Sequence, residues 1–350
     1  MRVLCIDCEG PITKNDNALE LCQHFLPDGG KFFSLVSKYD DCLADVIKRE
    51  GYRAGTTLKF IVPFLKAYGV GNNQVKDYSA SHLLLLPGAK ELLFQVQMEM
   101  PVFIISTSYS PYIEAMCDVV NFPCENTYST KIDFDRYFIP LKEIDRLKIL
   151  YQEILNLPGI ELEGVKSEEE LSRGSKATLK RLDEILNKEI PSMRCGEILS
   201  QINPVGGEEK KKAVVDTLKK TKTNPSQVIY VGDSITDVEA LKLVREGKGI
   251  SLSFNGNRYA LKAAEFALIS SHTFPIFLLS KRFNEKGKNE VEKLAQSWKE
   301  NLSSCERKKL IYLKIETCFT KATEDSLSFL IGESEAMRKK VRGKEVGKLG

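Results

Sequence analysis

The chain has 350 residues, of which 42% are hydrophobic and 28% charged, with a formal net charge of +3. These values are ordinary for a soluble globular protein, and the mixture of both charge signs excludes a strong general attraction to nucleic acid. The nine cysteines form no paired framework, and no apolar run reaches the ~18 residues that a membrane-spanning helix needs. We therefore expect a soluble, cytoplasmic protein with no nucleic-acid partner and no membrane insertion.

Short and nearly continuous apolar segments predict strands that are buried on both faces. These segments are the apolar start of the stretch 3–13, 101–107 and 227–233, with weaker candidates at 249–254 and 265–270. Helical patterns lie between them, at 87–97, 112–120, 211–220 and 237–244. Strands that alternate with helices predict the α/β class and a Rossmann-like open parallel sheet.

Two helical stretches interrupt this alternation, and no strand is predicted after about residue 275. The expected division is a core of 1–13, 87–127 and 205–275, a helical cap of 14–86, a second, mostly helical insertion of 128–204, and a helical C-terminal extension of 276–350. The extension carries the basic run "MRKKVRGKEVGK" at 337–348. We expect this run to be a solvated tail, as charged runs usually are.

The three strongest strand segments end in residues that suit one chemistry. These residues are Asp7 and Glu9, Ser106 and Thr107, and Asp233 and Asp237. Ligands of open parallel sheets bind at the carboxyl ends of the strands, so we expect these side chains to converge. Carboxylates that lie close together require a cation or a proton, and hard oxygen ligands suit Mg²⁺. The sequence therefore predicts a magnesium site.

The ordered motifs resemble the haloacid dehalogenase (HAD) superfamily of phosphohydrolases. The resemblance rests on "DCEG", "IIST", a lysine at the start of a helix, and "GDSITD". With "LPGAKELL" and the cap between the first two motifs, the chain looks closest to the phosphoserine-phosphatase-like branch. It is also similar to methanogen proteins of this superfamily that are assigned as an energy-converting hydrogenase A subunit. That similarity implies an archaeal protein and leaves room for a protein partner.

The resemblance implies a role for each carboxylate. Asp7 would be the nucleophile and would form an aspartyl-phosphate. Mg²⁺ would be held by Asp7, by the backbone carbonyl of Glu9 and by Asp233, with Asp237 supporting the ion through water or a hydrogen bond. Glu9 departs from the family pattern, which has Asp at this position as general acid and base. Glutamate can transfer the same protons, although it is one methylene longer.

The resemblance also implies phosphate-binding residues. Ser106 would bind a phosphoryl oxygen through its hydroxyl, helped by the Thr107 backbone N–H; the Thr107 hydroxyl is the alternative. The lysine must come from the run 210–212. Val214, Val215 and Leu218 follow Lys211 at spacings of three, four and seven, so we expect Lys211 to share their buried face.

The sequence says little about the leaving group. Asp16 stands nine positions after Asp7, where the resemblance places an acidic substrate contact. The cap segment 56–68 supplies Lys59 but no arginine, which disfavours phosphoserine because a substrate carboxylate lacks a bidentate partner. Asn255 and Asn257, in a segment that resembles archaeal sugar-phosphate phosphatases, are either substrate contacts or parts of a tight turn.

These observations favour a Mg²⁺-dependent phosphohydrolase of a small phosphorylated metabolite. Two alternatives use the same fold. One is a regulatory or assembly subunit with little activity, for example of a hydrogenase complex. The other is a phosphomutase, which transfers the phosphoryl group to an acceptor other than water.

Overall fold

A seven-stranded sheet forms the centre of the computed structural model, which describes residues 1–343 and 346. The strand order is β3-β2-β1-β4-β5-β6-β7; β1 to β6 are parallel and β7 is antiparallel to β6. The strands are β1 (Val3–Ile6), β2 (Val102–Tyr109), β3 (Thr127–Thr130), β4 (Val228–Gly232), β5 (Ile250–Phe254), β6 (Phe266–Ser270) and β7 (Thr317–Lys321). The α/β class and the open, mostly parallel sheet are therefore as predicted.

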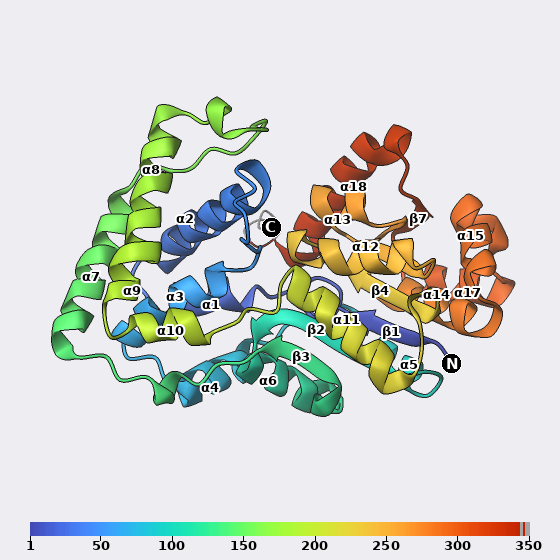
Figure 1. The fold of residues 1–350 in the computed structure, drawn as a ribbon. Coiled ribbons are helices and arrows are strands. Elements are labelled where there is room, and N and C mark those ends of the chain that lie inside the picture. The colour runs from blue at the N-terminus through green and yellow to red at the C-terminus, as the bar shows by residue number, and fades with distance from the viewer. Residues whose placement is uncertain (344–345, 347–350) are drawn as a thin grey trace.

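Both faces of the sheet are buried under helices (Figure 1). In β1, Leu4 and Ile6 pack into one hydrophobic cluster, and Val3 and Cys5 pack into the other. The first cluster lies under α5 (Ala89–Gln97), α6 (Ser110–Val120) and α14 (Phe274–Lys286). The second lies under α11 (Glu208–Thr221), α12 (Val238–Glu246) and α13 (Arg258–Ala263). This two-sided burial explains why the strands are nearly continuous apolar runs.

Two strands were not predicted. β3 begins the segment that we expected to be mostly helical, and β7 shows that the expected end of the strands near residue 275 is wrong. β7 is an edge strand of sequence "TCFTK" in which only Phe319 is buried. Its polar character hides it from a hydrophobicity pattern, because one apolar side chain is all that it contributes to the core.

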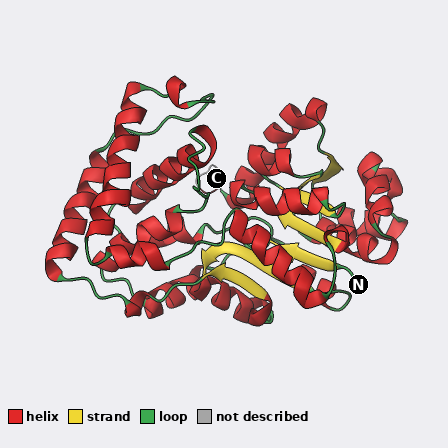
Figure 2. Cartoon of the chain, in the orientation of Figure 1, coloured by secondary structure: helices red, strands yellow, loops and turns green. Residues whose placement is uncertain are grey.

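A further group of helices forms a helical body beside the sheet (Figures 1 and 2). It contains α1 (Asn17–Phe25), α2 (Gly29–Asp41), α3 (Thr57–Ala67), α4 (Asn72–His82), α7 (Leu141–Asn156), α8 (Arg173–Glu184), α9 (Ile190–Ser192) and α10 (Gly196–Gln201). Contacts of α1 with β2 and of α4 with α6 join this body to the sheet and its helices. Buried residues from 18–75 and from 134–202 join in one hydrophobic cluster. The two helical insertions thus share a core, while their boundaries remain a prediction.

The two connections between the sheet and α1–α4 run side by side. The Lys14 N–H donates to the Leu84 carbonyl at 2.8 Å, and the Leu86 N–H donates to the Ile12 carbonyl at 2.8 Å. The first connection follows β1 and the residues after it. The attachment of these helices to the sheet therefore lies next to Asp7 and Glu9.

The C-terminal part packs against the sheet. α15 (Lys288–Gln296), α16 (Trp298–Asn301) and α17 (Ser304–Tyr312) precede β7, and α18 (Glu324–Arg342) follows it and lies along α13 and β6 (Figure 1). The expected solvated tail is wrong for this helix, because Arg338 is 4% exposed. Residues 344–345 and 347–348 of the basic run lie outside the described part. No helix within that part is long and apolar enough to cross a bilayer.

Candidate functional site

Adjacent strand ends bring three aspartates together. Asp7 follows β1 directly, Asp233 follows β4 directly, and Asp237 ends the short 3₁₀ turn Ile235–Asp237 before α12. Because β4 is hydrogen-bonded to β1, one carboxylate oxygen from each aspartate lies within 4.8 Å of the others. All three residues are buried. Three carboxylates at this spacing repel one another unless cations or protons compensate them.

Lys210 compensates two of these carboxylates. Its Nζ donates to Asp7 Oδ2 at 2.5 Å and to Asp237 Oδ1 at 2.8 Å, and its side chain has no exposed area. Burial opposes the ammonium charge, but Asp237 and Asp7 more than offset burial and raise the pKa of Lys210 above its ordinary value. The ammonium therefore stays charged between the two aspartates.

The prediction that Lys211 points inward is wrong. Lys211 pairs with Glu208 at 3.2 Å, and its side chain is 40% exposed. The buried face of α11 consists of Lys210, Ala213, Val214 and Thr217. The prediction took Val214, Val215 and Leu218 as the buried face, but only Val214 is buried, and Val215 and Leu218 are half-buried. Ala213 and Thr217 of this buried face are small enough to let α11 pack closely on β2.

Hydrogen bonds also fix the orientation of the Asp7 and Asp237 carboxylate groups. Asp7 Oδ1 accepts from the Cys8 N–H at 2.7 Å. Asp237 Oδ1 accepts from the Tyr230 hydroxyl at 2.7 Å, and its Oδ2 accepts from the Asp233 N–H at 3.0 Å. These hydrogen bonds fix the Asp237 side chain in place, and Asp237 in turn holds the backbone N–H of Asp233.

The pKa values of Asp7 and Asp237 shift in opposite directions. Burial, opposed by Lys210 and reinforced by the two other aspartates, raises the pKa of Asp7 to about 8 in the metal-free chain. Burial also acts on Asp237, but Lys210 and the Tyr230 hydroxyl hold the pKa of this carboxyl below its ordinary value. A divalent cation at the cluster would favour the ionised form of Asp7.

Gly10 allows the loop after β1 to approach Asp233. Its φ of +100° lies in the region that favours glycine, and a Cβ there would meet Asp233 Oδ2 at 2.2 Å. The loop that carries the Glu9 carbonyl thus lies against the second aspartate. The candidate ligand atoms for a cation are carboxylate oxygens of the three aspartates and the Glu9 carbonyl oxygen, which is the type of ligand that Mg²⁺ prefers. The residues therefore fit a magnesium ion.

Glu9 and Asp16 both bind the first turn of α1. Glu9 Oε1 accepts from the Asn17 N–H at 2.8 Å, and Asp16 Oδ1 caps the helix by accepting from the Leu19 N–H at 3.0 Å. Burial raises the pKa of both carboxyls, although backbone N–H groups and Arg342 oppose the rise. A raised pKa favours the protonated form that a general acid requires.

Ser106 and Thr107 lie within β2, near the aspartates. The Ser106 hydroxyl donates to Ser108 Oγ at 3.0 Å and accepts from the Ser108 N–H at 3.2 Å. The Thr107 hydroxyl is buried and makes no hydrogen bond. A buried hydroxyl without a partner is costly, so the Thr107 hydroxyl fits an acceptor such as a phosphoryl oxygen.

A cavity of about 110 Å³ connects these groups. Its lining includes the predicted residues Asp7, Glu9, Asp16, Ser106, Thr107 and Asp233. A second cavity of about 660 Å³ adjoins it, lies between α2 and α13, and shares Ser37 and Asp41 with the first. The small cavity suits a phosphoryl group, and the larger one has room for the remainder of a substrate.

The two predicted asparagines serve the loops after β5. Asn255 Nδ2 donates to the Ser270 carbonyl at 2.7 Å, and its Oδ1 accepts from the Ser270 N–H at 2.8 Å. Asn257 caps α13 through the Tyr259 N–H at 3.0 Å and borders the larger cavity. Asn255 borders neither of these two cavities, because both ends of its amide tie the β5 and β6 ends together.

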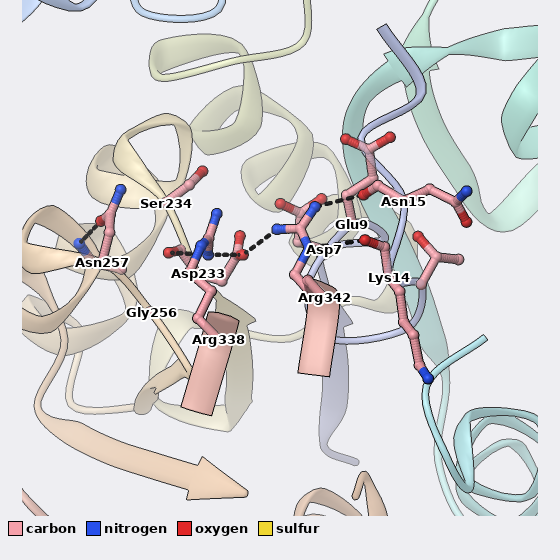
Figure 3. A network of polar contacts seen from close by, with 12 residues as sticks. Asp7, Glu9, Lys14, Asn15, Asp233, Ser234, Gly256, Asn257, Arg338 and Arg342 are labelled. Carbon is pink, nitrogen blue, oxygen red and sulfur yellow. Dashed lines mark hydrogen bonds and ion pairs between the residues drawn. The ribbon is translucent and has the colours of Figure 1, made fainter. Parts of the chain in front are cut away.

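The sequence analysis missed two arginines of α18 that reach the site (Figure 3). Arg338 Nη1 contacts Asp233 Oδ2, and Arg342 Nη1 contacts the same oxygen at 3.1 Å. A signal for this was present, because Leu330, Ser334, Arg338 and Arg342 follow one another at the four-residue spacing of a single helix face. The basic composition of the run 337–348 led instead to the prediction of a solvated tail.

Comparisons with known proteins establish the fold and no more. No protein-family model and no curated protein matches the chain. The solved structure of gene product AF1437 from Archaeoglobus fulgidus has a TM-score of 0.84 and 28% identity, over 100% of this chain and 99% of that one. An apo phosphoserine phosphatase has a TM-score of 0.45 and 9% identity over 75% of this chain and 90% of its own. A HAD family hydrolase from Salmonella enterica serovar Typhi has a TM-score of 0.45 and 12% identity over 79% of this chain and 70% of its own.

Proposed function

We propose that this protein is a Mg²⁺-dependent phosphohydrolase of the HAD type that acts on a small phosphorylated metabolite through an aspartyl-phosphate at Asp7. One observation carries this proposal. The Asp7 carboxylate, bridged by Lys210 to Asp237 and lying beside Asp233, borders a cavity of about 110 Å³ that Ser106 and Thr107 also line. A structural role does not require these groups to face one cavity.

Asp7 is oriented for attack on phosphorus. The Cys8 N–H and the Lys210 ammonium each hold one of its oxygens. Such fixed placement compensates for the weak nucleophilicity of a carboxylate. Asp7, Asp233 and the Glu9 carbonyl would hold Mg²⁺, with Asp237 in support; the bound ion would neutralise charge on the phosphoryl oxygens.

Glu9 is the proton carrier in this proposal. Its raised pKa keeps a proton on the carboxyl, which is then available to the leaving oxygen. After that transfer the carboxylate can accept a proton from the water that attacks phospho-Asp7. The Asn17 N–H holds one Glu9 oxygen at 2.8 Å, which fixes the longer side chain in place.

The phosphoryl group would take its remaining contacts from β2, and α11 would supply positive charge from behind Asp7. The Thr107 hydroxyl is buried without a hydrogen bond, and the Ser106 hydroxyl lies one residue before it in the same strand. The Lys210 ammonium supplies positive charge behind Asp7. The substrate's leaving group would occupy the larger cavity between α2 and α13.

The test is hydrolysis of p-nitrophenyl phosphate by the full chain, with Mg²⁺ and with EDTA. Asp7→Asn should abolish turnover because it removes the nucleophile. Lys210→Met should lower kcat by 100-fold or more, whereas Lys211→Met is the matched control and should keep the native rate. Equal rates in the native chain and Asp7→Asn would contradict the proposal.

A second candidate is a protein that binds a phosphorylated ligand with little turnover. The contact of Arg338 and Arg342 with Asp233 favours it, because an aspartate already neutralised is a poorer ligand for a cation. It predicts that inorganic phosphate stabilises the native chain against heat while no substrate is hydrolysed. Transfer to an acceptor other than water would instead give a phosphorylated product without free phosphate.

A further inference from the structure

One face of α18 is built around Asp233. Ser334 Oγ donates to the Gly256 carbonyl at 2.6 Å, Arg338 Nη1 donates to the Asp233 carbonyl at 3.2 Å as well as to Oδ2, and Arg342 Nη1 donates to Oδ2 at 3.1 Å. Figure 3 shows both arginine side chains extending from the helix toward the same carboxylate. The helix face at residues 334, 338 and 342 thus packs on the loops around Asp233, the candidate metal ligand.

The two guanidinium groups together fill the hydrogen-bond accepting capacity of Asp233 Oδ2. A carboxylate oxygen has two lone-pair directions, and this oxygen accepts from two different arginines. The three side chains are 3–5% exposed, so water screens the ion pairs little. Two positive charges therefore stand where a divalent cation would be attracted.

Arg342 also binds the connection that leads into α1–α4. Its Nε donates to the Lys14 carbonyl at 3.1 Å and its Nη2 to the Asn15 carbonyl at 2.5 Å. The same side chain thus joins Asp233 to the segment through which the helical body is attached. The last turn of α18 contacts both the carboxylate cluster and this connection.

We propose that Arg338 and Arg342 are an internal counter-cation for Asp233, and that a divalent cation competes with them for this carboxylate. The inference rests on the divalent-cation site of the proposed function. By reciprocity, whatever weakens the docking of α18 strengthens cation binding, and cation binding weakens the docking of α18. The two arginines are positioning residues that set the cation affinity of the site.

The first test measures Mn²⁺ affinity of the metal-free full chain by the loss of the free-Mn²⁺ electron paramagnetic resonance signal. Arg338→Gln and Arg342→Gln should each bind Mn²⁺ at least about tenfold more tightly than the native chain, because each removes one competing charge-assisted contact. The matched control is Lys339→Gln, since Lys339 lies on the same helix, is 41% exposed and pairs with Glu335. The control should stay within twofold of the native chain.

The second test needs no variant and therefore does not depend on the folding of one. Amide hydrogen exchange of the segment 334–342 is followed in the native chain with EDTA and with saturating Mg²⁺. Mg²⁺ should speed exchange there several-fold, because the arginines lose their partner. Exchange that is unchanged or slower would overturn the inference.

The outcomes separate the inference from the proposed function. If the native chain, both arginine variants and the control bind Mn²⁺ equally, or if the variants bind it more weakly, the competition does not exist and only the inference fails. If neither the native chain nor any variant binds Mn²⁺, both the inference and the proposed function fail. Binding by the arginine variants alone would support the inference.

Discussion

Replacing Lys210 by methionine is the perturbation whose consequence is most directly set by the structure. The side chain has no exposed area and makes ion pairs of 2.5 Å and 2.8 Å with two buried carboxylates. Removing one partner of a buried ion pair costs about 3–5 kcal/mol, because the other charge is left without compensation. Lys210→Met should therefore lower the free energy of unfolding by about 3–5 kcal/mol in EDTA.

The control lies one residue away. Lys211 is 40% exposed and pairs with Glu208 three residues earlier in the same helix, an arrangement that contributes about 0.5 kcal/mol or less. Lys211→Met should therefore change the stability by no more than that. The two variants make the same chemical change in the same helical turn, so propensity cannot explain a difference between them.

The assay is urea unfolding in EDTA, followed by the fluorescence of Trp298, which is the single tryptophan and packs in the cluster under the sheet. Adding Asp7→Asn to Lys210→Met should restore part of the loss, because only Asp237 then remains uncompensated. A loss below about 1 kcal/mol for Lys210→Met, or a double variant less stable than the single one, would refute the reasoning.

Three further predictions follow from the geometry of the site. Gly10→Ala should destabilise the chain and weaken Mn²⁺ binding, because the added Cβ would meet Asp233 Oδ2 at 2.2 Å. The control is Gly51→Ala, since Gly51 has a φ of +71° and nothing within 4 Å of an added Cβ. This control should cost only the ~1–2 kcal/mol of backbone strain and leave Mn²⁺ binding unchanged. Ser106→Ala should weaken competitive inhibition by inorganic phosphate about tenfold in steady-state assays, and an unchanged inhibition constant would exclude the hydroxyl from the phosphate site. Burial and Asp40 raise the pKa of Asp41 to about 7, above its unfolded value of 3.8, so the folded chain binds this proton more strongly. The contribution of Asp41 to stability therefore falls as pH rises from about 4 to 7. In urea unfolding, Asp41→Asn should be more stable than the native chain at pH 8 and lose that advantage at pH 4.

The strands that carry the site were predictable because their signal is local. A strand buried on both faces must be apolar throughout, so "VLCI" and "VIYVG" indicated their positions and the polar residues that follow them. The parallel arrangement then places Asp7 and Asp233 together at the carboxyl ends of neighbouring strands. β7 was missed because an edge strand needs only one buried side chain, Phe319.

The choice among adjacent lysines was not local. Successive helix positions differ by about 100° in direction, so a one-residue error in the inward face exchanges a buried ammonium for an exposed one. The spacing of Val214, Val215 and Leu218 suggested Lys211. The close approach of α11 to the strands, which only small residues such as Ala213 permit, places Lys210 inside instead.

The amino-acid sequence alone determined the class of the fold, the order of the strands' functional ends and the oxygen-rich chemistry of the residues there, because each depends on side chains within a few positions of one another. Only the tertiary structure decided which cations meet those oxygens. Lys210 and Arg338 reach Asp7 and Asp233 across 203 and 105 residues, respectively. The four-residue spacing in α18 places Arg338 and Arg342 on one helix face, but the energy of their contacts depends on burial and direction, which the packing of distant helices sets.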